Sequence, residues 1–301
     1  MLQAIHTPSL SNAKIKLFIK REDLLKVVPN NPHISGNKWR KLKYNLLKAK
    51  QEKKSTLLSF GGAYSNHLHA LAAAGKAFDF STIGIIRGEP IFPLNPTLQF
   101  AHNQGMRLEY ASRQEYRQKN EPTFIDSLHQ KHENFHLIPE GGTNQLALKG
   151  CAEIVENIDI SFDYICCPVG TGGTLAGIIT SLKAPQKAIG FAALKGNFLS
   201  REIQQLLGQK EGESHPNWHI QNDHHFGGYA RHTPQLLDFI NKFKQEHNIQ
   251  LEPLYTGKMF YGIFDLIQQQ YFPEGTTIIA IHTGGLQGLA GFQERFGKLL
   301  I

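Results

Sequence analysis

Cysteine and long apolar runs are scarce in this chain, and acidic residues are outnumbered by basic ones. Only three of the 301 residues are cysteine, and Cys166 and Cys167 are adjacent in an apolar run. Such a set does not form a disulfide framework, so we expect a reduced, cytoplasmic protein. No apolar run reaches the ~18 residues of a membrane helix, and the N-terminus lacks the apolar core of a signal peptide. We therefore expect no membrane partner.

The excess of positive charge is concentrated at one end of the chain. The formal net charge is +7, yet residues 1–54 contain 13 Lys and Arg against 3 Asp and Glu, whereas the remainder contains 19 against 22. A basic segment can bind nucleic acid, but aromatic stacking residues are few here, and Trp39 belongs to a helical apolar stripe. We therefore expect no nucleic-acid partner, and interpret the neighbouring lysines as the solvated side of a helix; these are Lys41, Lys43, Lys48 and Lys50.

Short apolar runs alternate with helix-like segments along the chain. The runs predicted as strands are 55–60, 81–86, 163–169 and 276–285, and the predicted helices include 67–78, 94–104 and a segment from Leu175. Continuous apolar strands separated by helices indicate an α/β fold with parallel sheets covered on both faces. We expect two lobes, each a mostly parallel sheet flanked by helices: a smaller lobe of residues 42–149 inserted into a larger one of residues 1–41 and 150–301.

The segment SGNKWRKL (residues 35–42) places Lys38 near the start of a predicted helix. A cation is unfavourable there because the helix dipole is positive at its N-terminus. The pKa of such a lysine can be depressed, and a neutral amine is what Schiff-base chemistry requires. The alternative interpretation is an ordinary surface lysine in a lysine-rich helix.

Two further segments follow predicted strands and open predicted helices. GGAYSNH (61–67) offers Ser65 and Asn66 at a helix start, where carboxylates and phosphates bind, although a plain N-cap has the same appearance. GTGGT (170–174) combines backbone N–H groups with two hydroxyls, which suits one phosphate group. It lacks the third glycine of a dinucleotide fingerprint and the Lys-Ser/Thr of a nucleoside-triphosphate loop. A turn without a ligand is the alternative.

Three histidines are candidate metal ligands. His129, His132 and His136 can share one helical face, but they lie in a strongly polar segment typical of a solvated surface. We therefore assign no metal.

Together, a lysine, a one-phosphate cradle and a Ser-Asn helix start suggest pyridoxal phosphate, an aldehyde cofactor with a single phosphate. SGNKWRKL, GGAYSNH, GTGGT and LYTGK (254–258), in this order, resemble motifs of the fold type II pyridoxal-phosphate enzymes. The resemblance is greatest to the group of 1-aminocyclopropane-1-carboxylate deaminases and D-cysteine desulfhydrases. It runs from about Lys20 to HTGG (282–285) and implies the tryptophan synthase β-like fold and a homodimer.

The resemblance implies roles for individual residues. Lys38 matches the Schiff-base lysine that also moves the substrate α-proton, and Asn66 matches the residue that binds the cofactor ring oxygen. Ser65 matches a serine near the substrate carboxylate. Two tyrosines that face the substrate match Tyr229 and Tyr255, and the phosphate loop matches Thr171, Gly172, Gly173 and Thr174.

One position departs from the cyclopropane deaminases, which usually carry Glu after the tyrosine, facing the pyridine nitrogen. Here that position is Thr256. A carboxylate would keep the ring nitrogen protonated and strengthen the electron sink. A neutral hydroxyl favours β-elimination, where a leaving group carries the electrons away.

We therefore predict a pyridoxal-phosphate-dependent lyase that converts a small amino acid to a 2-oxo acid and ammonia by D-cysteine desulfhydrase-like β-elimination. One alternative is a 1-aminocyclopropane-1-carboxylate deaminase, which the two tyrosines favour. Another is a homologue that binds the cofactor without turnover, since fold resemblance does not establish activity.

Overall fold

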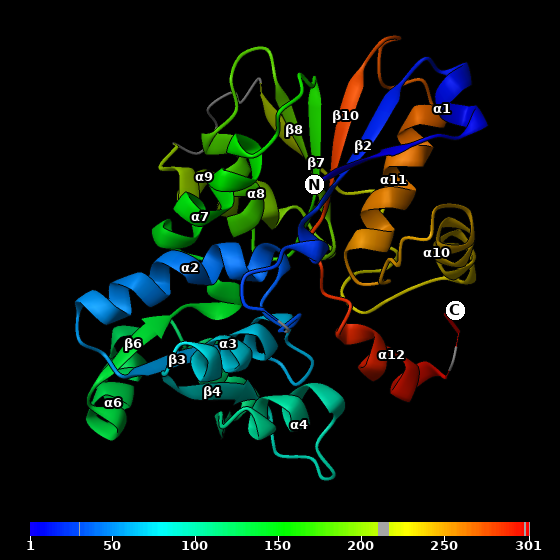
Figure 1. Ribbon diagram of the computed structural model, residues 1–301. Coiled ribbons are helices and arrows are strands. Elements are labelled where there is room, and N and C mark those ends of the chain that lie inside the picture. Colours follow the sequence, from blue (N-terminus) through cyan, green and yellow to red (C-terminus); the bar gives the residue numbers. More distant parts are fainter. Residues whose placement is uncertain (30, 210–216, 298, 301) are drawn as a thin grey trace.

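The chain folds into two lobes, each built on its own sheet (Figure 1). The computed structural model describes residues 1–29, 31–209, 217–297 and 299–300. None of the helices in these ranges has the length and apolarity needed to cross a bilayer.

The larger lobe contains a six-stranded sheet in the order β1-β2-β10-β7-β8-β9. Its strands are β1 (Leu2–Ile5), β2 (Lys16–Arg21), β7 (Tyr164–Val169), β8 (Lys187–Ala192), β9 (Trp218–Gln221) and β10 (Thr277–His282). All neighbours are parallel except β1, which pairs antiparallel with β2. The central strands are buried almost throughout, because helices cover both faces of the sheet.

Two separate apolar cores lie on the two faces of this sheet. One is formed with α1 (Pro8–Asn12), α10 (Pro234–His247) and α11 (Thr256–Gln268), and the other with α7 (Gln145–Glu156), α8 (Gly173–Thr180) and α9 (Phe198–Leu207). Figure 1 shows these two sets of helices on opposite sides of the sheet.

The smaller lobe contains a four-stranded, wholly parallel sheet in the order β5-β4-β3-β6. Its strands are β3 (Thr56–Gly61), β4 (Ser81–Arg87), β5 (Arg107–Ala111) and β6 (Phe135–Ile138). Its helices are α3 (Asn66–Ala77), α4 (Pro96–Asn103), α5 (Arg113–Arg117) and α6 (Pro122–His132). The prediction of an α/β protein with two mostly parallel sheets is confirmed.

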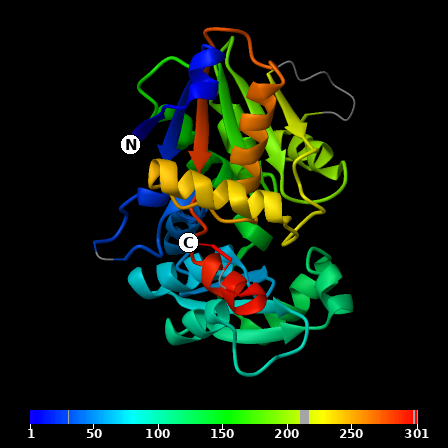
Figure 2. The ribbon, with the colours of Figure 1, turned by 90° about the vertical axis from the view of Figure 1, so that its right-hand side faces the viewer.

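Two helices connect the lobes. α2 (Gly36–Gln51) leads from the larger lobe, after the short turn η1 (Glu22–Leu24), into the smaller one. α12 (Gly288–Phe296) follows β10 yet packs against α4, so the C-terminal part of the chain returns to the smaller lobe (Figure 2). The predicted lobe limits at residues 41/42 and 149/150 fall inside α2 and α7 and stay predictions.

The three histidines considered as metal ligands do not share a helical face. His129 and His132 lie on α6, whereas His136 lies on β6, because the helix ends at His132. The described part of the chain contains no group of three or more His, Cys, Asp or Glu placed to hold a metal ion.

The topology of both sheets directs ligands to the same cleft. β3 has β4 on one side and β6 on the other, and β7 lies between β8 and β10, so each sheet reverses its winding beside a central strand. Parallel sheets bind ligands beyond the carboxyl ends of their strands at such positions. The loops that follow β3 and β7 both line the cavity between the lobes.

Candidate active site

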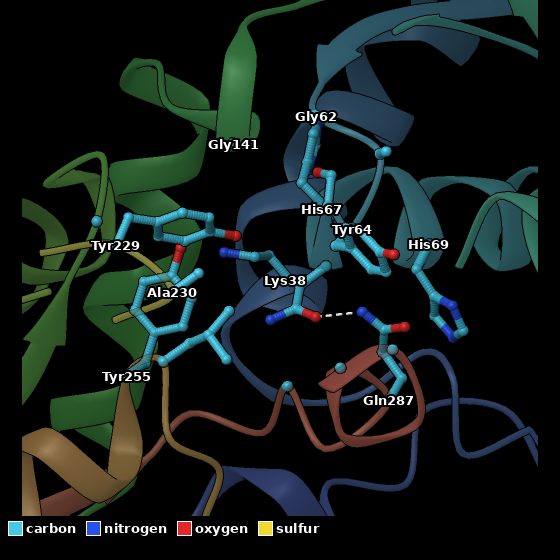
Figure 3. Close-up of a pocket in the computed structure, with 18 of the residues that line it drawn as sticks. Lys38, Gly62, Tyr64, His67, His69, Gly141, Tyr229, Ala230, Tyr255 and Gln287 are labelled. Carbon is cyan, nitrogen blue, oxygen red and sulfur yellow. Dashed lines mark hydrogen bonds between the residues drawn. The ribbon is translucent and has the colours of Figure 1, made fainter. Parts of the chain in front are cut away.

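The cleft holds a cavity of about 1790 Å³, lined by both lobes. The predicted site residues that line it are Lys38, Ser65, Asn66, Thr171, Gly172, Thr174, Tyr229 and Tyr255. Figure 3 shows Lys38 near the centre of this cavity, with Tyr229 and Tyr255 on one side and Tyr64 on the other. Gly173 and Thr256 are close to the cavity but do not line it.

The first turn of α2 places Lys38 in the cavity. Gly36 has φ +66°, and a Cβ there would lie 2.3 Å from the Thr283 carbonyl oxygen at the end of β10. Only glycine permits this approach, which lets the Asn37 N–H donate to the same oxygen at 3.1 Å. Burial lowers the pKa of Lys38, so its amine is more readily neutral and nucleophilic.

A compact cradle for an anion forms between β7 and α8. Gly172, in the left-handed region at φ +78°, is the N-cap of α8, so the first N–H groups of the helix face the cavity end. Asn37 Nδ2 donates to Thr174 Oγ1 at 2.9 Å and ties the start of α2 to this loop. A Cβ on Gly173 would lie 2.8 Å from Thr143 Oγ1, so the cradle has no room for a side chain there.

Lys41 corrects the expectation that it belongs to the solvated side of α2. It is only 2% exposed, and its Nζ donates to the Gly141 carbonyl at 3.0 Å, to Thr143 Oγ1 at 3.0 Å and to Thr171 Oγ1 at 3.2 Å. Burial, with the charge of Lys38 adding, lowers the pKa of Lys41 to about 7. Residues three apart share a helical face, so the position of Lys41 three residues after the cavity-facing Lys38 is the signal in the sequence for its burial.

The remaining lysines of that set do lie toward solvent. Lys48 and Lys50 are exposed, and the half-buried Lys43 pairs with Glu153 at 2.6 Å. Lys41 is therefore the member of the set that adds positive charge to the anion cradle.

The smaller lobe contributes the start of α3. Ser65 caps this helix, its Oγ accepting from the Leu68 N–H at 3.2 Å, which leaves the hydroxyl proton free to donate into the cavity. The first N–H groups of α3 point the same way and attract a carboxylate. Asn66 Oδ1 accepts a hydrogen bond from Gln287 Nε2, drawn as the dashed line in Figure 3.

Two tyrosines form the opposite wall. The Tyr255 ring packs over Gly170 of the anion cradle, with 3.1 Å from its Cε1 to a Cβ built on that glycine. Tyr229 lies edge-on to it at a centroid distance of 6.0 Å and is 42% exposed at the cleft mouth. Burial raises the pKa of Tyr255 well above its ordinary value, so it stays a neutral phenol.

A buried lysine supports the loop that carries Tyr229. Lys258 is 1% exposed, and its Nζ donates to the carbonyl oxygens of His225 at 2.9 Å and Gly228 at 2.7 Å. Burial lowers its pKa to about 8. Lys258 lies on the first turn of α11, and this helix begins directly after Tyr255. Its two bonds therefore hold the segment that carries Tyr229 next to the one that carries Tyr255.

Thr256 departs from its predicted position opposite a pyridine nitrogen. It is fully buried, its N–H and Oγ1 both bond Glu252 Oε1, at 2.6 and 3.0 Å, and it does not line the cavity. The reason is that the Glu252 carboxylate accepts from the N–H groups of Leu254, Tyr255 and Thr256 where α11 begins, and draws the Thr256 hydroxyl with them. The hydroxyl residue that does line the cavity on this side is Thr283, at the end of β10.

The residues present fit a cofactor with one phosphate and one aldehyde. A buried amine, an anion cradle that a Cβ would fill and an amide beside them occupy one cavity. A phosphate would meet the start of α8 and Lys41, and an aldehyde would meet Lys38.

Comparison with known proteins agrees with this chemistry. The chain belongs to the family of pyridoxal-phosphate dependent enzymes, whose pattern matches residues 3–284, and its cofactor is pyridoxal phosphate. A Pyrococcus furiosus protein provisionally named 1-aminocyclopropane-1-carboxylate deaminase is 30% identical over 299 residues, covering 94% of this chain and 89% of its own. The mitochondrial bifunctional D-cysteine desulfhydrase/1-aminocyclopropane-1-carboxylate deaminase of Arabidopsis thaliana is 29% identical, covering 97% and 78%.

A solved structure described as an ACC deaminase homologue has the same fold. It covers all of this chain and 93% of its own, with a TM-score of 0.81 and 27% sequence identity.

Proposed function

We propose that the protein is a pyridoxal-phosphate-dependent lyase that performs D-cysteine desulfhydrase-type β-elimination on a small amino acid. With D-cysteine and one water, the products are pyruvate, hydrogen sulfide and ammonia. The observation that carries this proposal is the buried amine of Lys38 beside an anion cradle, in a cavity that is also lined by the neutral hydroxyl of Thr283.

The cofactor would be held at three points by residues of this chain. Lys38 would bond its aldehyde carbon, and Asn66 would donate to its ring oxygen. The phosphate would be bound by Lys41 and by the cradle of Thr171, Gly172, Gly173 and Thr174. When bound, pyridoxal phosphate supplies an electron sink that stabilises negative charge at the substrate α-carbon.

The substrate would be bound and deprotonated by groups around the same cavity. The Ser65 hydroxyl and the start of α3 would bind its carboxylate. Once the substrate amine has taken the place of Lys38 on the cofactor, the freed Lys38 amine, its pKa lowered by burial, would take the α-proton. The carbon–sulfur bond would then break with its electron pair leaving on sulfur, and the neutral Tyr255 phenol is placed to donate a hydrogen bond at that side of the cavity.

The neutral hydroxyl that the sequence analysis assigned to Thr256, opposite the pyridine nitrogen, would instead be that of Thr283. A neutral hydroxyl at the end of β10 does not keep a pyridine nitrogen protonated as a carboxylate does. Asp23, a carboxylate near this strand end, is engaged by Arg21 through bonds of 2.9 and 2.7 Å. This environment supports β-elimination over cyclopropane ring opening.

The test compares two substrates on purified protein with added pyridoxal phosphate. We expect a yellow protein, borohydride attachment of the cofactor at Lys38, and faster release of pyruvate and sulfide from D-cysteine than of 2-oxobutanoate from 1-aminocyclopropane-1-carboxylate. The Lys38→Ala variant should lose turnover by roughly a thousandfold. A protein that stays colourless with the cofactor contradicts the proposal.

The second candidate is 1-aminocyclopropane-1-carboxylate deamination, favoured by the pairing of Tyr229 with Tyr255. Faster 2-oxobutanoate release would select it. A yellow protein that turns over neither substrate, nor a panel of D- and L-amino acids, would instead be the cofactor-binding homologue without turnover.

We also propose that the protein acts as a cytoplasmic homodimer, as the family resemblance implies. The three cysteines are free and buried, which is compatible with a reducing compartment. Light scattering coupled to gel filtration tests the assembly, and a single species of monomer mass would contradict it.

A further inference from the structure

A chain of hydrogen bonds reaches Asn66 from outside the cavity. Thr97 Oγ1 donates to Gln287 Oε1 at 3.1 Å, and Gln287 Nε2 donates to Asn66 Oδ1. Thr97 and Asn66 belong to the smaller lobe, at the starts of α4 and α3, whereas Gln287 is the N-cap of α12, which follows the last strand of the larger sheet. This relay was not anticipated from the sequence, because its members are separated by up to 221 positions.

The direction of the chain follows from the buried hydroxyl at its outer end. Thr97 is 1% exposed, and a buried O–H needs an acceptor. Gln287 Oε1 is the acceptor recorded for it among the described residues. Reversing the Gln287 amide would leave this proton unpaired, which costs more than the bond itself contributes. The amide is therefore oriented with its N–H₂ group toward Asn66.

That orientation determines which atom Asn66 presents to the cavity. Its oxygen accepts from Gln287, so its Nδ2 lies on the other side, against Gly285. A Cβ on Gly285 would lie 2.9 Å from Asn66 Nδ2, and this glycine has φ +84°. The absence of a side chain leaves the space beside Nδ2 open to a ligand.

We infer that Gln287 and Thr97 are positioning residues that turn the Asn66 amide so that its Nδ2 donates to the ring oxygen of pyridoxal phosphate. The inference rests on the proposed cofactor site. A reversed Asn66 would present its oxygen to the cofactor oxygen, and two acceptors repel. Because α12 packs back onto the smaller lobe, the cofactor contact of that lobe depends on a residue of the C-terminal segment.

Four variants test the relay on the full-length protein, with two readouts that do not require turnover. These are the Kd of pyridoxal phosphate and the pH midpoint of its visible absorption change when bound. Gln287→Leu removes the relay and should weaken cofactor binding about tenfold. Gln287→Glu should weaken it at least as much, because a carboxylate accepts from Asn66 Nδ2 and draws it away from the cavity.

The threonine variants form a matched pair. Thr97→Val frees the Gln287 amide to reverse and should weaken binding, whereas Thr97→Ser keeps the hydroxyl and should restore it. In the variants that lose the relay the midpoint should move to higher pH. A ring oxygen without a donor holds the neighbouring imine proton more tightly.

A double-mutant cycle shows whether Gln287 affects cofactor binding through Asn66 or only through the packing of α12 on the smaller lobe. If Gln287 acts through Asn66, adding Gln287→Leu to Asn66→Ala should change Kd by less than about twofold. The inference is overturned if the Gln287 variants keep the wild-type Kd and midpoint, or if Gln287→Leu retains its full effect without Asn66. Wild-type protein that takes up no pyridoxal phosphate would instead refute the proposed site itself.

Discussion

The two walls of the cavity are built in different ways. On the larger-lobe wall, the cradle after β7 is tied by several bonds at once, from Lys41 to Gly141, Thr143 and Thr171, and from Asn37 to Thr174. On the smaller-lobe wall, Asn66 is oriented by the single relay through Gln287.

This difference implies that the larger-lobe wall mainly sets the affinity for the phosphate, whereas the smaller-lobe wall mainly sets the hydrogen bonding of the cofactor ring. Several hydrogen bonds at once hold the phosphate end, which makes it tolerant of losing one contact. A single relay makes the ring-oxygen end sensitive to one amide and to the packing of α12 on the smaller lobe. We therefore expect substitutions on the larger-lobe wall to change affinity most, and substitutions on the smaller-lobe wall to change the environment of the bound ring.

The largest effect is expected for Gly173→Ala. The added Cβ would lie 2.8 Å from Thr143 Oγ1 and 3.2 Å from Lys41 Nζ, so it fills the cradle. We expect pyridoxal phosphate to bind at least roughly a hundredfold more weakly, as overpacking a tight site costs a few kcal/mol. Gly62→Ala, on the other wall, is the matched control: its Cβ meets only Arg87 Nη2, at 3.5 Å. Equal losses in an absorbance titration of both variants would contradict the contrast between the walls.

A smaller, pH-dependent effect is expected for Lys41→Met. Above the lowered pKa of about 7, Lys41 is neutral in the free protein, and a bound phosphate dianion favours its ammonium form. Phosphate binding therefore takes up a proton, and affinity should fall as the pH rises from about 7 to 9. Lys41→Met should weaken binding about thirtyfold at the lower pH.

The probe for this prediction is pyridoxine 5′-phosphate, which has no aldehyde and cannot bond Lys38. Calorimetry should show a pH slope for the wild type and a flatter one for Lys41→Met. The exposed Lys50→Met variant should match the wild type. A wild-type affinity independent of pH would contradict a role for Lys41 in phosphate binding.

The smallest effect is expected for Lys258→Met, because Lys258 supports the tyrosine wall and does not reach the anion cradle. Losing its bonds to the carbonyls of His225 and Gly228 should loosen the segment carrying Tyr229 and raise KM about fivefold. The cofactor Kd and visible spectrum should stay as in the wild type. A Lys258→Arg variant keeps the charge and should recover part of the loss, whereas a changed cofactor spectrum would place Lys258 in a different role.

Local patterns in the sequence predicted much of the fold. The predicted strand 81–86 corresponds to β4 and 163–169 to β7, and the predicted helix 67–78 is α3 shifted by one residue. These elements follow from the spacing of apolar residues and from glycine or capping residues at their ends. Both signals act over only a few positions of the chain.

Residues that depend on distant contacts were predicted less well. Its position three residues after Lys38 indicates only that Lys41 shares a helical face with it, and the sequence does not show that Thr143 and Thr171 cover that face of α2. Thr256 was assigned to the cavity because the motif aligned it there, whereas Glu252 draws its hydroxyl into the helix start. Gln287 and Thr97 offered no motif at all.

The sequence by itself determined the two mostly parallel sheets, the lysine at a helix start and the glycine-rich loop after a strand, because periodicity, capping and turn chemistry are local. Only the tertiary structure decided which charges are buried and how the Asn66 amide is oriented, since these depend on hydrogen bonds between residues that lie far apart in the sequence. The pKa of Lys41 and the orientation of Asn66 both arise from such contacts.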